Sequence, residues 1–66
     1  MDEFTIICMK IKTGKEFYLA SGPGKSLKWV TDKMEAIWFE TDKEAEKCAK
    51  NYFKYFKDWY LSNIVY

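Results

Sequence analysis

Short runs of alternating apolar and polar residues fill the first half of the chain and predict β-strands. From Phe4 to Lys12, neighbouring residues fall on opposite faces, and both faces carry apolar side chains. A second run, Glu16 to Ala20, follows the three-residue connection Thr13 to Lys15, whose central glycine is typical of a β-hairpin. Leu27 to Thr31 forms a third run. The pattern therefore predicts a hairpin followed by a third strand.

Two helix starts follow the predicted strands. In the segment Asp32 to Ala36, Asp32 and Glu35 stand at the spacing of a capping box, which predicts a helical turn. Ile37 to Glu40 is predicted to be a short extended piece. Thr41 and Glu44 repeat the capping-box spacing and mark the start of a longer helix.

That longer helix is predicted to run from Asp42 to Tyr60, because its apolar residues gather on one side of a helical wheel. This apolar face is formed by Ala45, Cys48, Ala49, Tyr52, Phe53, Phe56, Trp59 and Tyr60. The opposite side carries a stripe of Lys43, Lys47, Lys50, Lys54 and Lys57. Asn63 to Tyr66 is predicted to return as a short strand. We therefore expect one α+β domain over residues 1–66, with an antiparallel sheet of three to four strands and one long helix packed on one face.

Aromatic side chains exceed what one helix and one sheet face can bury. Five Phe, five Tyr and three Trp make up 20% of the 66 residues, and each large ring buries about 150–250 Å². Tyr18, Trp38, Tyr55 and Tyr66 point toward an edge or the opposite face of the sheet. Exposed Tyr and Trp are enriched at binding hot spots, so Tyr18, Trp38 and Tyr55 are candidate partner-binding residues, unless bends and twist bury them.

Positive charge is concentrated on the predicted helix, although the net charge is only +1. Residues 1–46 carry seven Lys and nine acidic residues, whereas residues 47–66 carry four Lys and one Asp. We therefore regard Lys47, Lys50, Lys54 and Lys57 as candidate partner-binding residues. Three interpretations stay open for this stripe, which are a solvated face, a protein contact and a nucleic-acid contact.

The residue types argue against catalysis and against a bound cofactor or metal ion. The chain has no His and no Arg, which removes the commonest metal ligand and the usual acid–base group near neutral pH. Cys8 and Cys48 are expected to be buried free thiols. Asp42, Glu44 and Glu46 are explained by the favourable charge interaction at a helix start. The acidic opening and the absence of a long apolar run predict a cytoplasmic protein without a membrane span.

The middle of the sequence resembles a recurring pattern in small uncharacterised proteins of bacteriophages and prophages. A hairpin with a Tyr-Leu element, here Tyr18-Leu19, leads to a step built on Trp, Thr and Asp, here within Trp29 to Asp32. Ala36 to Ala45 then follows the pattern A-x-x-F-x-T-x-x-E-A. Such accessory proteins are often inhibitors that bind a host protein, including CRISPR effectors and other immune machinery. The resemblance therefore implies an anti-defence, anti-CRISPR-like inhibitor.

We expect a non-enzymatic protein-binding module that blocks a bacterial host or defence protein by steric occlusion, and a homodimer is compatible with this role. One alternative is a nucleic-acid-binding accessory protein that uses the helix lysines, although a net charge of +1 without arginine disfavours nucleic acid. Another is an oligomeric sponge that traps a signalling nucleotide between subunits.

Overall fold

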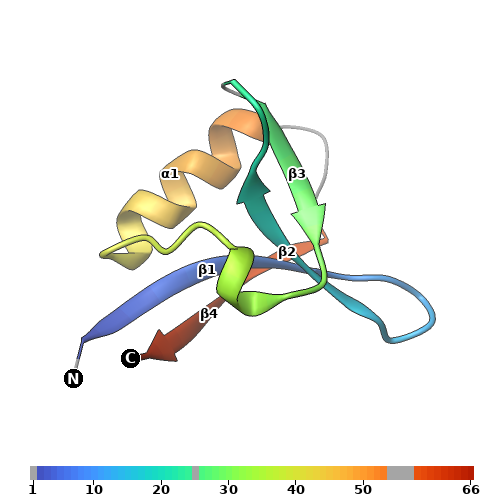
Figure 1. Ribbon diagram of the computed structural model, residues 1–66, viewed down its shortest axis with the longest axis horizontal. Helices are drawn as coiled ribbons and strands as arrows, with labels where there is room; N and C mark the ends of the chain where they lie inside the picture. Colours follow the sequence, from blue (N-terminus) through green and yellow to red (C-terminus); the bar gives the residue numbers. More distant parts are fainter. Residues whose placement is uncertain (1, 25, 54–57) are drawn as a thin grey trace.

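The protein is an α+β domain with a four-stranded antiparallel sheet (Figure 1). The computed structural model describes residues 2–24, 26–53 and 58–66. The strands are ordered β3-β2-β1-β4 across the sheet, so the last strand of the chain lies beside the first. The elements along the chain are β1 (Glu3–Lys10), β2 (Glu16–Ser21), β3 (Leu27–Val30), a 3₁₀ turn η1 (Lys33–Glu35), α1 (Asp42–Tyr52) and β4 (Trp59–Val65). This arrangement confirms the predicted fold class, the hairpin and the helical turn.

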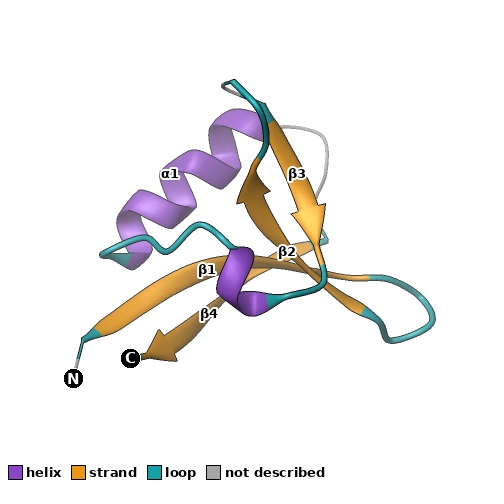
Figure 2. Ribbon diagram, viewed as in Figure 1, coloured by secondary structure: helices purple, strands orange, loops and turns teal. Residues whose placement is uncertain are grey.

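Helix α1 packs on one face of the sheet through a small core of aliphatic residues (Figure 2). Ile7 and Leu19 contribute from the two central strands, and Ala45 and Ala49 contribute from the helix; all four are buried. Alanine has no side chain beyond Cβ, so these two positions let the helix backbone approach the sheet closely. Larger residues fill the periphery, where the rings of Trp29 and Phe53 stack with their centroids 5.4 Å apart.

The opposite face of the sheet has a core of its own. Ile6, Cys8 and Tyr18 are buried there, and Trp38 packs against this cluster. The Trp38 ring lies 5.4 Å, centroid to centroid, from both Phe4 and Tyr66. The segment that contains η1 therefore covers the face that α1 leaves open. This second core uses aromatic side chains as well as aliphatic ones, with Tyr18 buried and Trp38 half-buried.

Residues 37–39 carry the chain from one face of the sheet to the other, and they pass between β1 and β2. These two strands pair only where Cys8–Lys10 meets Glu16–Tyr18, and residues 37–39 lie beside both strands beyond that point. The backbone N–H groups of Thr5 and Phe39 each donate to the other residue's carbonyl at 2.8 Å, and the Ile37 N–H donates to the Leu19 carbonyl at 2.9 Å. Trp38 then faces one core while Phe39 faces the other. The short extended piece predicted for residues 37–40 is thus confirmed as a bridge to β1.

Helix α1 begins where the sequence predicts. The Thr41 hydroxyl accepts a hydrogen bond from the Glu44 backbone N–H at 3.2 Å, which satisfies one of the unpaired donors of the first turn. The buried Thr5 hydroxyl donates to the Asp42 carboxylate and ties the same turn to β1. The start of the helix is therefore fixed both by its own cap and by the sheet.

The predicted end of the helix is wrong. Helix α1 ends at Tyr52, and Trp59 and Tyr60, which were assigned to its apolar face, lie in β4. Phe56, assigned to the same face, lies outside the described residues. The predicted final strand of Asn63 to Tyr66 was correspondingly too short. The physical reason is that Trp59–Val65 pairs with β1 along its whole length, and this segment is rich in aromatic and β-branched residues that favour strands.

Candidate functional site

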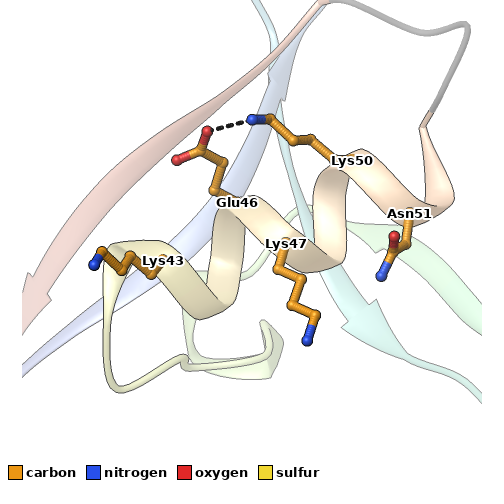
Figure 3. A pocket seen from close by; sticks show the side chains of 5 residues that line it. All are labelled: Lys43, Glu46, Lys47, Lys50 and Asn51. Carbon is orange, nitrogen blue, oxygen red and sulfur yellow. Dashed lines mark ion pairs between the residues drawn. The ribbon is translucent and has the colours of Figure 1, made fainter.

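The outer face of α1 carries a cluster of exposed polar side chains over a shallow depression of about 300 Å³ (Figure 3). The cluster consists of Lys43, Glu46, Lys47, Lys50 and Asn51. Three- and four-residue spacing brings these residues to one side of the helix, and Ala45 and Ala49 face the sheet from the other side. We call this cluster the α1 outer face.

Charge on the α1 outer face is only partly neutralised. Lys50 forms an ion pair with Glu46, in which the ammonium nitrogen lies 2.8 Å from a carboxylate oxygen. The Lys50 side chain is 68% exposed and the Glu46 side chain 47%, so water screens this i,i+4 pair and it contributes only about 0.3–0.5 kcal/mol to stability. Lys47 and Asn51 project away from the pair (Figure 3). Within residues 2–24, 26–53 and 58–66, Lys43 and Lys47 have no ion-pair partner, so their positive charge is available to a ligand.

The structure places only part of the predicted binding set on this face. Lys47 and Lys50 lie there, as the helical spacing predicts. Lys54, Tyr55 and Lys57 lie outside the described residues. Tyr18 and Trp38, the other predicted contact residues, lie away from these lysines, because both belong to the core on the opposite face of the sheet.

Tyr18 and Trp38 also differ from the prediction in their exposure. Tyr18 is 7% exposed, and its hydroxyl donates to the Glu16 carboxylate at 3.3 Å. Trp38 is half-buried, and its indole N–H donates to the Lys33 carbonyl at 3.3 Å. Alternation along the strand predicts the correct side of the sheet for Tyr18. It could not show that the segment around η1 folds back over that side and covers it.

Cys8, Tyr18 and Tyr60 form a row of polarisable side chains on this second face, and the sequence pattern did not predict this row. Cys8 of β1 stands between Tyr18 of β2 and Tyr60 of β4, because the strand register aligns all three residues. The Glu16 carboxylate lies beside this row, and the Lys33 ammonium lies 5.8 Å from the centroid of the Tyr18 ring. The row was missed because Tyr60 was assigned to the helix. The row can be recognised only when the register of β1 with β2 and with β4 is known.

The environment of the row favours the protonated forms of the Cys8 thiol and the Tyr60 hydroxyl. The pKa of the Cys8 thiol is raised to about 11, mainly by burial and also by the Glu16 carboxylate, while Lys33 acts in the opposite direction. Burial also raises the pKa of Tyr60 to about 12, and contact with Glu16 acts in the same direction. Burial raises the pKa of the Cys48 thiol as well. The thiolate is the nucleophilic form of cysteine, so neither thiol is an effective nucleophile near neutral pH.

These raised pKa values predict a loss of stability in alkali. A group that keeps its proton to higher pH in the folded state stabilises the fold below its ordinary pKa and loses that contribution as pH rises through the folded value. For Cys8 this window runs from 9.0 to about 11. We expect urea denaturation to show constant stability near neutral pH and a steady decline across this window. Cys8→Ala should make the decline shallower, and an equal decline in the variant would contradict a role for the thiol.

The described residues provide neither a metal cluster nor a membrane helix. No group of three or more His, Cys, Asp or Glu side chains among them could hold a metal ion. The described helices are also too short and too polar to cross a membrane. Comparison of the chain with protein-family models, with curated proteins and with solved structures gave no match.

Proposed function

We propose that the protein is a non-enzymatic protein-binding module whose α1 outer face contacts an acidic surface of its partner. The observation that carries this proposal is the exposed, unneutralised charge of Lys43 and Lys47 beside the shallow depression. Several of the aromatic residues, which offered the other candidate surface, pack against one another within the fold, in the Trp29–Phe53 stack and around Trp38. The α1 outer face is therefore the better-supported contact surface.

The resemblance to bacteriophage accessory proteins supports a particular class of partner. A bacterial host or immune-defence protein would be blocked by steric occlusion when the α1 outer face docks on it. A protein contact fits this face better than a nucleic-acid contact does. Glu46 stands in the middle of the lysines and is paired with Lys50. The closely and regularly spaced phosphates of a nucleic acid would be repelled by this carboxylate, whereas an acidic protein surface can place its carboxylates opposite Lys43 and Lys47 alone.

Charge reversal on α1 tests the proposal. The partner captured from a bacterial lysate would be purified and titrated with the parent protein and with the double variant Lys43→Glu, Lys47→Glu. We expect affinity to fall at least about tenfold, equivalent to about 1.4 kcal/mol of binding free energy. The fold should be retained, because both side chains are exposed and a glutamate at position 43 suits the start of a helix.

A matched control separates a local contact from bulk charge. The variant Lys15→Glu, Lys28→Glu makes the same change in net charge at two exposed positions away from α1. We expect it to bind with nearly the affinity of the parent protein at physiological salt. Equal losses in the two double variants, or no loss in either, would reject the α1 outer face as the binding surface.

A further inference from the structure

Strand β4 is an outer strand of the sheet and lacks the features that usually prevent pairing with another chain. It runs for seven residues, and the segment from Trp59 to Tyr66 contains no charged residue, no proline and no glycine. Edge strands in soluble proteins are normally short or protected by charge, proline or bulges. The other outer strand, β3, fits that rule, because it has four residues and one of them is Lys28. The two edges of the sheet are thus very different.

The register shows which backbone groups of β4 face outward. Asp2 and Tyr66 exchange two backbone hydrogen bonds, at 3.0 and 2.9 Å. Hydrogen-bonded and non-hydrogen-bonded pairs alternate along an antiparallel ladder. The N–H and C=O groups that point away from β1 therefore belong to Trp59, Leu61, Asn63 and Val65. In the part of the chain that the structure describes, these backbone groups have no hydrogen-bond partner.

We propose that this edge binds β4 of a second copy, in antiparallel orientation about a two-fold axis at Ser62. This register places Trp59 opposite Val65 of the second copy and Leu61 opposite Asn63 of the second copy. All four outward-facing residues of each strand then join hydrogen-bonded pairs. The two sheets become one continuous sheet of eight strands. Both copies of α1 lie on the same side of it, since the axis is perpendicular to the sheet.

Side-chain chemistry favours a second copy as the occupant of this edge. In the proposed register Tyr60 lies opposite Ile64 of the second copy, and this pair occurs twice by symmetry; aromatic and β-branched residues form favourable cross-strand pairs. The strand carries no charge, so two copies do not repel each other along it. Tyr60 and Val65, which are 37% and 60% exposed, would be partly covered.

The charges that flank the strand select the antiparallel orientation. Lys10 and Lys12 lie near the start of β4, beside a surface depression that Asp58 also lines. Near its end lie Glu3 and Glu40, which line a second depression together with Asp2. A two-fold axis brings the basic end of one copy toward the acidic end of the other, whereas parallel pairing would bring like charges together. Such a pairing uses both β4 edges and closes at two copies.

Opposite charges at position 62 test this dimer. Ser62 meets its own symmetry mate in a non-hydrogen-bonded pair, where side chains are closest and like charges repel. Sedimentation equilibrium should give the parent protein a mass of about 16 kDa, twice the chain mass of 7.9 kDa. Ser62→Lys alone and Ser62→Glu alone should each give the mass of one chain, and their mixture should restore the mass of two.

The same chemical change elsewhere provides the control. Ser21→Lys introduces the same charge at an exposed position at the end of β2, and it should leave the mass at that of two chains. A parent protein with the mass of one chain from micromolar to millimolar concentration would overturn the proposal. So would single Ser62 variants that keep the mass of two chains.

Amide exchange of the parent protein provides a test without mutation. Within β4, the amides of Tyr60, Ser62 and Ile64 point toward β1 and should be protected at any concentration. The amides of Trp59, Leu61, Asn63 and Val65 should gain protection as the protein associates. Rapid exchange of these four in a species with the mass of two chains would overturn β4 pairing. The proposal concerns β4 alone, so its failure would leave the proposed role of the α1 outer face intact.

Discussion

Replacing Ile7 with alanine is expected to reduce the free energy of unfolding by about 3–5 kcal/mol. Ile7 is fully buried between the sheet and α1. Truncation of a buried isoleucine removes its transfer free energy and leaves a cavity, at a total cost of about 2–5 kcal/mol. Two of its core neighbours, Ala45 and Ala49, have no side-chain freedom with which to fill that cavity, so the cost should lie in the upper part of the range.

A loss of this size would remove much of the stability of so short a chain, since globular proteins average only about 0.05–0.15 kcal/mol per residue. Urea denaturation followed by circular dichroism measures the effect. Ile11→Ala is the matched control, because the same atoms are removed from a side chain that is 39% exposed. We expect that variant to lose about 1 kcal/mol or less. If the two variants lose equal stability, α1 does not pack against Ile7.

Much of the β-structure could be predicted because its signals are local. Alternating residues defined β1 and β2 to within two residues at either end, and the connection at Gly14 gave the hairpin. Gly14 has a φ of +89°, a conformation that glycine adopts without strain. The start of α1 was equally local, because Thr41 caps the helix with its own side chain.

The end of α1 could not be predicted, because competing signals overlap there. The apolar residues that follow Phe53 fit a helical wheel, yet Trp59–Val65 also suits a strand, and only pairing with β1 decides between them. That pairing joins residues separated by most of the chain. Tyr52 shows the consequence, because it was assigned to the packed face and is 63% exposed in the last turn of the helix.

The candidate site was predicted only in part, because some of its features depend on local spacing and others on contacts between distant parts of the chain. Helical spacing alone places Lys47 and Lys50 together on α1. The burial of Tyr18 and Trp38, by contrast, depends on the separation of β1 from β2 and on the passage of residues 37–39 beside both strands. Neither feature leaves a local pattern in the sequence. Surplus aromatic residues therefore suggested a binding surface, whereas the structure uses several of them in a second core.

Trp38→Ala provides a direct test of that second core, and it should reduce the free energy of unfolding by about 3 kcal/mol. Truncation of a buried Phe or Trp costs about 3–5 kcal/mol, and the half-buried Trp38 belongs at the lower end. The variant loses ring contacts with Phe4 and Tyr66 and the indole hydrogen bond to the Lys33 carbonyl.

Trp38→Phe separates the packing of this residue from its hydrogen bond. The phenylalanine ring retains much of the contact with Phe4 and Tyr66 but has no N–H donor. We therefore expect the free energy of unfolding to fall by about 1 kcal/mol, the usual value of one hydrogen bond. Urea denaturation measures both variants, and titration with the captured partner measures their affinity at a temperature where each is folded. If Trp38 serves the core, stability falls in the order parent, Phe, Ala while affinity stays constant. A Trp38→Ala variant with the stability of the parent protein and a large loss of affinity would instead make Trp38 a contact residue and move the binding surface to the face opposite α1.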